Sequence, residues 1–181
     1  VGFHGPVGIS IFNPFSIEHF NAVIQKGKKN KITIDDPLVI SPGIATGKLM
    51  GGNLSVLISM IGTPYECDWS NHIIFIEEVG ESTYRIDRML TQLRSAQKFK
   101  GVKGIVLGHF TRCDAQPGDP YYEFSTSLSE VFKDRLGDLD IPVMGGGPFG
   151  HEEDNVTLPI GIKAVMDTEK GVLKLLESAV T

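Results

Sequence analysis

Residues 72–108 read HIIFIEEVGESTYRIDRMLTQLRSAQKFKGVKGIVLG and contain a strand, a helix and a second strand in direct succession. The apolar run from His72 to Glu77 predicts a buried strand. From Tyr84 to Phe99, apolar residues recur at helical spacing and form one face. Val102 to Leu107 predicts a second buried strand, which ends at Gly108. Parallel strands joined by a helix make a right-handed crossover, so this stretch predicts an α/β fold.

The pattern continues toward the C-terminus with another helix and another strand. Ser127 and Glu130 have the spacing of a capping box, which predicts a helix that ends at Gly137. Ile141 to Met144 predicts a third buried strand, and Lys163 to Leu176 predicts a β-hairpin. We therefore expect an α/β domain with a largely parallel sheet flanked by helices.

The first sixty residues predict shorter elements. Ser16 is placed to cap a helix at its N-terminus, and the alternation between Lys31 and Ile40 predicts short strands with a turn. Leu54 to Ile61 is apolar nearly all round and predicts a short buried helix with Asn53 as its N-cap. The N–H groups of that helix could also receive a carboxylate or phosphate, but capping alone explains Asn53.

Length, charge and cysteine content exclude several classes of function. The 181 residues suffice for one domain, and a net charge of −5 argues against nucleic-acid or anionic-membrane partners. No apolar run approaches the ~18 residues of a membrane span. Cys67 and Cys113 do not form a zinc or disulfide pattern, so we expect a reducing, cytoplasmic location. The start at Val1 rather than Met suggests a piece of a longer protein.

The candidate chemistry lies where the predicted strands end, because ligands of open α/β sheets collect beyond the carboxyl ends of the strands. Glu77, Glu78, His109 and His151 all fall there. A histidine can take a proton from a hydroxyl, and a carboxylate on its other ring nitrogen fixes the tautomer. Glu77 could do this for His151, although an ordinary ion-pair glutamate and a surface histidine remain the simpler interpretation. Adjacent strand residues point to opposite faces, so we expect at most one of Glu77 and Glu78 to face inward.

A nucleophile is not evident from the residues alone. No Gly-x-Ser-x-Gly elbow occurs, Ser10 lies in a strand-like stretch, and Cys113 has no neighbour that would lower its pKa. The glycines at 145–147 suggest either an oxyanion donor or a tight loop. A metal-dependent amidohydrolase using His151 is a weaker alternative, because consecutive loop residues such as 151–154 rarely converge on one ion.

Aromatic residues offer one further hypothesis. Trp69 and the pair at 121–122 could stack on a nucleobase, but surface or core packing is the simpler explanation.

Taken together, these segments resemble the LD-carboxypeptidases, a serine-peptidase family that includes the microcin C immunity peptidases. The matching segments run in family order over most of the chain: His4-Gly5-Pro6, Gly51-Gly52-Asn53-Leu54, Gly62-Thr63-Pro64, residues 75–81, residues 84–90, residues 104–108 and residues 150–161.

The resemblance implies a two-domain enzyme of which this chain is the C-terminal domain. Such enzymes carry a nucleophilic serine in a Gly-aromatic-Ser-Asp turn of an N-terminal, flavodoxin-like domain, and that turn is absent from residues 1–181. A swivelling β/β/α domain supplies the glutamate and histidine, which match Glu77 as the acid and His151 as the base. The role of Glu78 stays open. We expect residues 1–181 to form this domain, with about 1–30 as a residual connection to the missing N-terminal domain.

The resemblance also implies an activity. The intact enzyme would cut the amide between a diamino acid and a terminal D-alanine in murein peptides, with no metal or cofactor, and the chain alone would be inactive. A peptide-nucleotide antibiotic of the microcin C type is an alternative substrate, and a non-catalytic binding or assembly module is an alternative function. The family also implies a homodimer.

Overall fold

A computed structural model of the chain describes residues 1–7, 13–118 and 122–180. In chain order the elements are β1 (Phe3–His4), α1 (Pro14–Phe20), the π-helix η1 (Asn21–Gln25), β2 (Lys31–Thr33), β3 (Leu38–Ser41), β4 (Ile44–Asn53), α2 (Leu54–Ser59), β5 (His72–Val79), α3 (Thr83–Ser95), β6 (Gly104–Thr111), the 3₁₀ helix η2 (Tyr122–Phe124), α4 (Leu128–Leu136), β7 (Val143–Gly145), β8 (Leu158–Pro159), β9 (Lys163–Asp167) and β10 (Val172–Leu175).

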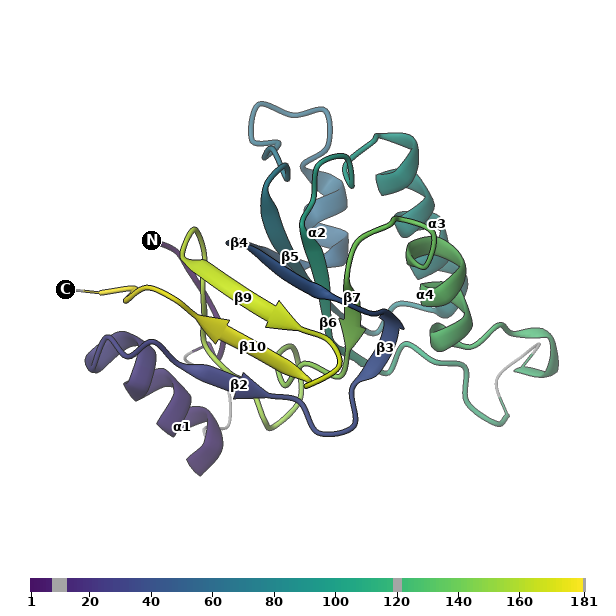
Figure 1. The fold of residues 1–181 in the computed structure, drawn as a ribbon. Helices are drawn as coiled ribbons and strands as arrows, with labels where there is room; N and C mark the ends of the chain where they lie inside the picture. Colours follow the sequence, from purple (N-terminus) through teal and green to yellow (C-terminus); the bar gives the residue numbers. More distant parts are fainter. Residues whose placement is uncertain (8–12, 119–121, 181) are drawn as a thin grey trace.

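The centre of the molecule is one mixed sheet in the order β2-β10-β9-β4-β5-β6-β7-β3. Strands β4, β5, β6 and β7 run parallel, and the strands on both sides of them are antiparallel. The predicted α/β fold with a largely parallel sheet is confirmed for these four strands (Figure 1). The C-terminal hairpin of β9 and β10 is also confirmed, and it extends the sheet beyond β4.

Helices α2, α3 and α4 lie together on one face of the parallel strands, and α1 lies apart from them near β2 (Figure 1). Ile74 and Ile76 of β5 pack with Ile86 and Leu90 of α3 in the core beneath these three helices. The capping box at Ser127 is present at the start of α4, as expected. Ile74 and Ile76 are alternate residues of β5, so both point to this face of the sheet.

The opposite face of the sheet carries a second core. Ile73 and Phe75 of β5 enter it, together with Val23 from η1 and Phe149 from the segment after β7. Both faces of β5 are thus covered, which is why its sequence is a continuous apolar run rather than an alternation.

Strand β4 is the main element that sequence analysis missed. Its ten residues lie between β9 and β5 and end at Asn53, the N-cap of α2. Glycine has low strand propensity, and this strand contains Gly47, Gly51 and Gly52. Buried and exposed residues nevertheless alternate at the start of the strand, where residues 45, 47 and 49 are buried and residues 44, 46 and 48 are exposed.

One expectation for the N-terminal part is wrong. Asn13, not Ser16, caps α1, because its side chain accepts a hydrogen bond from the backbone N–H of Ser16. The predicted short strands between residues 31 and 40 do form, as β2 and β3, and they do not pair with each other. They lie at opposite edges of the sheet, where β2 pairs with β10 and β3 pairs with β7.

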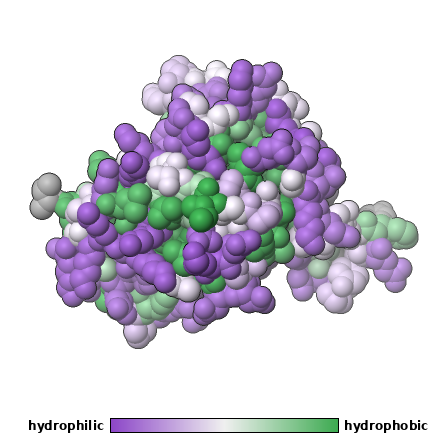
Figure 2. All heavy atoms as spheres, viewed as in Figure 1, coloured by the Kyte–Doolittle hydropathy of each residue, from purple (hydrophilic) through white to green (hydrophobic). Residues whose placement is uncertain are grey.

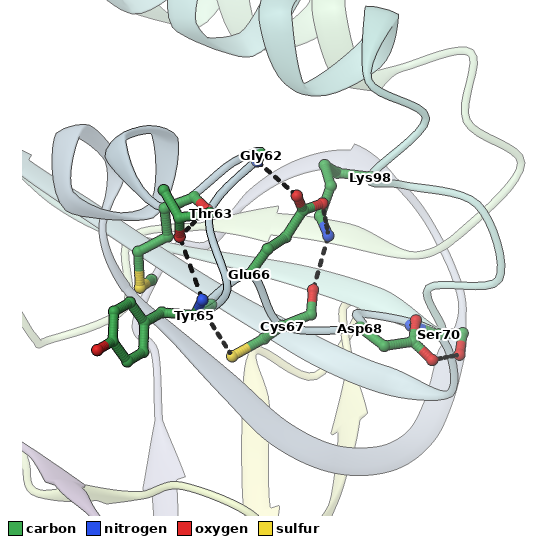
Figure 3. A network of polar contacts seen from close by, with 9 residues as sticks. Gly62, Thr63, Tyr65, Glu66, Cys67, Asp68, Ser70 and Lys98 are labelled. Carbon is green, nitrogen blue, oxygen red and sulfur yellow. Dashed lines mark hydrogen bonds and ion pairs between the residues drawn. The ribbon is translucent and has the colours of Figure 1, made fainter.

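The loop between α2 and β5 is held by a polar network (Figure 3). Glu66 accepts hydrogen bonds from the backbone N–H of Gly62 and from Lys98 Nζ, which also donates to the carbonyl of Cys67. The ammonium group of Lys98 lies 5.4 Å from the ring centre of Trp69. Trp69 is buried against Phe99, so its packing leaves no face for a nucleobase.

The surface in the same orientation is mostly hydrophilic, with hydrophobic side chains between polar ones (Figure 2). The exposed large hydrophobic residues come from separate elements, among them Ile44, Val56, Tyr65, Tyr84 and Phe124. Among the described residues, no helix is long and apolar enough to cross a bilayer.

Candidate active site

Glu77 lies near the carboxyl end of β5, on the face of the sheet opposite helices α2–α4. Its neighbours at alternate positions, Ile73 and Phe75, belong to the core on that face. The side chain of Glu77 is completely buried. Glu78 is also buried, on the other face, so the expectation that only one of the two faces inward is wrong. The reason is that β5 is central and covered on both sides.

The structure brings His151 and Glu77 together, although 74 residues separate them in the chain. Nδ1 of His151 lies 2.8 Å from Oε2 of Glu77. An ionised carboxylate can only accept a hydrogen bond, so the ring donates from Nδ1 and keeps Nε2 as the nitrogen that can take a proton. The His151 side chain is half exposed, whereas its partner is not exposed at all.

Gly150 makes this contact possible. Its φ of +125° is unfavourable for other residues, and a Cβ there would lie 3.1 Å from Glu77 Oε2 and 3.2 Å from the carbonyl oxygen of His109. The backbone at Gly150 therefore lies directly against the candidate acid.

Burial determines the electrostatics of the pair. Loss of solvation raises the pKa of Glu77, and the charge of Glu78 raises it further, while the hydrogen bond and charge of His151 oppose both effects. Oε1 of Glu77 is buried without a hydrogen-bond partner among the described residues. A carboxylate in so dry a position interacts strongly with a cation next to it, so it would stabilise an imidazolium at His151.

A hollow of about 430 Å³ opens beside His151 and is lined by residues 3–7 and by residues of the segment 150–155. His4 is part of its wall, and its ring packs against Phe75 and Phe149. Burial, and then the charge of His151, lower the pKa of His4 and favour its neutral form. The sequence motif His4-Gly5-Pro6 was the only signal for this wall, and it carried no predicted role.

Glu78 ties together the ends of three elements on the other face. Its Oε1 accepts hydrogen bonds from Asn53 Nδ2 at 2.7 Å and from the backbone N–H of Val79 at 2.9 Å. Its Oε2 accepts from the backbone N–H of Ser55 at 2.8 Å, in the first turn of α2. Asn53 caps α2 as predicted, and Glu78 is a second acceptor at the same helix end.

His109 lies within β6 rather than beyond its end, because the strand continues past Gly108 to Thr111. The pairing of β5 with β6 shifts register between Ile76 and Glu78, so that Gly108 and His109 of β6 together lie opposite Glu77. Nε2 of His109 is buried and has no partner among the described residues. Burial lowers the pKa of His109, against the opposing charges of Glu152 and Asp154.

Cys113, the other candidate nucleophile that the structure describes, does not join this pair. Cys113 is buried, burial raises its pKa, and its thiol faces the carbonyl of Thr111, as expected of an inert cysteine. Ser10 and Tyr121 lie outside the described residues. Within the ranges that the structure describes, no group of three or more His, Cys, Asp or Glu side chains is arranged to hold a metal ion.

Comparison with known proteins identifies relatives of this chain. The family described as the LD-carboxypeptidase C-terminal domain matches residues 46–166. A Synechocystis sp. protein that bears the name carboxypeptidase is 47% identical over 134 residues, which are 74% of this chain and 43% of that protein. The murein tetrapeptide carboxypeptidase of Pseudomonas aeruginosa is 34% identical over 67% of this chain and 38% of its own.

Solved structures show the same fold. The muramoyltetrapeptide carboxypeptidase of Oxalobacter formigenes superposes with a TM-score of 0.78 at 32% identity, over 96% of this chain and 59% of that one. A structure of MccF in complex with glutamyl sulfamoyl guanosine has a TM-score of 0.79 at 20% identity, over 99% of this chain and 62% of its own. The chain spans about half the length of the curated relatives that it matches.

Proposed function

This chain belongs to the LD-carboxypeptidase family, and we propose that it supplies the acid, Glu77, and the base, His151, of a serine-type carboxypeptidase site. Membership of this family supports a carboxypeptidase-type hydrolase activity for the protein. The observation that carries the residue assignment is the 2.8 Å contact between a fully buried carboxylate and a half-exposed imidazole beside a hollow.

The proposed chemistry is acyl transfer to a serine that a preceding N-terminal domain would provide. Nε2 of His151 takes the proton of the serine hydroxyl as its oxygen attacks the peptide carbonyl. The imidazolium, stabilised by Glu77, then protonates the leaving amine, and water hydrolyses the acyl-enzyme with His151 again as base. Glu77 keeps the ring in the tautomer that has Nε2 available.

We propose murein tetrapeptides as substrates, with cleavage between the diamino acid and the terminal D-alanine. Support comes from the relatives in Pseudomonas aeruginosa and Oxalobacter formigenes, whose names state a murein or muramoyl tetrapeptide substrate. A cytoplasmic location and a homodimer belong to the same proposal. Both cysteines are free thiols, which suits a reducing compartment.

The test is release of D-alanine from an L,D-tetrapeptide, by the 181-residue chain and by the product of the complete reading frame that contains it. We expect His151→Ala and Glu77→Gln to lower kcat of the longer protein by at least about a thousandfold, because the triad acts as a unit. His72→Ala, at the far end of β5, is the matched control and should keep turnover within about twofold. Turnover should also survive a chelator.

Parental turnover in His151→Ala would remove the base assignment. Release of D-alanine by the 181-residue chain alone would place a nucleophile within residues 1–181. If neither protein releases D-alanine but the tetrapeptide still binds, the non-catalytic alternative is the better one.

A further inference from the structure

The segment that carries His151 needs support beyond its contact with Glu77. This segment, residues 150–155, is called the His151 loop below, and it contains no helix or strand. A base must keep its reactive atom within about half an ångström of the productive position. One hydrogen bond from a half-exposed ring does not restrict the backbone on both sides of it, so other groups must hold the loop.

The hydroxyl of Ser16 supplies two of the missing contacts. It donates to the carbonyl oxygen of Glu153 at 2.9 Å and accepts from the backbone N–H of Asn155 at 3.0 Å. Ser16 is only 1% exposed, so water does not replace these bonds if the hydroxyl is removed. One side chain of α1 thus satisfies the loop backbone on both sides of Asp154.

Asn13 adds a third contact from the same turn of helix. Its Oδ1 accepts from the backbone N–H of Ser16, and its Nδ2 donates to Asp154 Oδ1 at 2.6 Å. The side-chain oxygen of Asn13 therefore caps α1, while the side-chain nitrogen binds the His151 loop. Within the loop, Asn155 Nδ2 donates to the carbonyl oxygen of Gly150 at 2.7 Å and closes it on itself.

The helix that makes these contacts is itself attached to the core. It continues directly into η1, where Val23 is buried in the same core as Phe75 and Phe149. Phe15, in the first turn of α1, packs against that core as well. The contacts at Asn13 and Ser16 are therefore made by an anchored element rather than by a free end.

We infer that Ser16 is a positioning residue for His151, assisted by Asn13, and that the first turn of α1 and the His151 loop form one unit. The catalytic consequence rests on the proposed function, because it requires His151 to be the base. The restriction of the loop does not depend on the proposed function. It follows from the four hydrogen bonds that the loop makes: two to Ser16, one to Asn13 and one between Asn155 and Gly150.

The first experiment measures the loop directly, by NMR of the 181-residue chain. Ser16→Ala should speed amide hydrogen exchange at residues 152–156 by about tenfold or more relative to the parent, since exchange reports local opening. The resonance of the His151 Nδ1 proton should broaden or disappear. Ser59→Ala, which removes an exposed hydroxyl of α2 that donates to the carbonyl oxygen of Val56, is the control and should change neither. Unchanged exchange and an unchanged resonance in Ser16→Ala would overturn the inference.

A second variant pair separates the loop contact from helix capping. Asn13→Asp keeps a capping oxygen of equal quality but turns a carboxylate toward Asp154, so exchange in the loop should rise while α1 stays capped. Adding Asp154→Asn restores a donor and an acceptor and should return exchange to within about twofold of the parent. This pair decides the question even if Ser16→Ala fails to fold. Absence of rescue would contradict the assignment of Asn13.

The catalytic consequence is measured in the product of the complete reading frame. Ser16→Ala should lower kcat on the L,D-tetrapeptide by about tenfold to a hundredfold, the range expected when a catalytic group moves by about an ångström. KM should stay within about twofold, because Ser16 does not line the hollow. An unchanged kcat in a loosened loop would overturn the positioning role. If Ser16→Ala loosens the loop but the parent protein releases no D-alanine, the proposed function is overturned instead.

Discussion

At the residue scale, the candidate site depends on positions where no side chain can be accommodated. Gly51, in β4, is the most extreme of them. A Cβ at Gly51 would lie 1.8 Å from the carbonyl oxygen of Phe75, two residues before Glu77 on the neighbouring strand. Since backbone cannot move aside as a flexible side chain can, this glycine determines how closely β4 lies against the strand that carries the candidate acid.

Neighbouring glycines allow this to be tested. Gly51→Ala should lower the free energy of unfolding by about 3 kcal/mol or more, or prevent folding, because backbone strain is added to a collision. Gly52→Ala has almost the same φ, +149° against +150°, but no atom within 4 Å of the added carbon. It should cost only about 1–2 kcal/mol from strain alone. Urea unfolding measures both, and equal losses would show that the contact with Phe75 is unimportant.

At the scale of elements, Glu78 joins β4, α2 and β5. It accepts hydrogen bonds from Asn53 at the end of β4, from Ser55 in the first turn of α2 and from Val79 in its own strand. Its negative charge also lies at the positive end of the helix, where an anion is stabilising. Glu78 is therefore a structural carboxylate at the helix end, whereas its neighbour Glu77 faces His151.

Removing this carboxylate should destabilise the protein more than a surface change does. Glu78→Ala leaves three donors without their acceptor and should lower the free energy of unfolding by about 3 kcal/mol. Glu78→Gln keeps one acceptor oxygen and should cost less, about 1–2 kcal/mol. Lys170→Gln, which removes the exposed partner of an ion pair with Asp167, is the control and should change stability by less than about 0.5 kcal/mol. A Glu78→Ala variant as stable as that control would contradict this role.

At the scale of the whole molecule, three half-buried histidines and the buried Glu77 make stability depend on pH. Burial lowers the pKa of His4, His19 and His109 below 6.5, their ordinary value. The unfolded chain therefore takes up these protons first as the pH falls, so folding becomes less favourable from about pH 6.5 downward. Glu77 affects the pH dependence of stability in the opposite direction. The pKa of Glu77 is raised above 4.5, so the folded state takes up that proton before the unfolded chain does as the pH falls. Protonation of Glu77 therefore makes folding more favourable as the pH approaches 4.5 from above.

We expect the free energy of unfolding, measured in urea, to fall between pH 7 and pH 5.5. Each histidine contributes a slope of at most about 1.4 kcal/mol per pH unit, and partial exposure keeps the observed slope in the lower part of that range. His109→Gln should make the dependence shallower, because it removes one of the three groups. A free energy that stays constant or rises as the pH falls would show that burial does not govern these imidazoles.

The sequence by itself determined the local elements and the residue types of the site. The strand beginning at His72, helices α3 and α4 and the C-terminal hairpin follow from periodicity and capping, which act over a few residues. Glu77 and His151 were candidates because ligands of open α/β sheets collect beyond the carboxyl ends of the strands, and because the family pattern contains both residues. Strand β4 was missed because its glycines fit a turn as well as a strand.

Only the tertiary structure decided which of these groups meet. The approach of His151 to Glu77 and the burial of Glu78 depend on the order of strands and on a backbone contact at Gly150, and neither is encoded within a short window of residues. Ser16 illustrates the difference, since a local pattern assigned it to a cap while its partners lie at residues 153 and 155. Short-range preferences determine helices and strands, but long-range packing determines which elements become neighbours. A site made from residues far apart in the chain therefore exists only after folding.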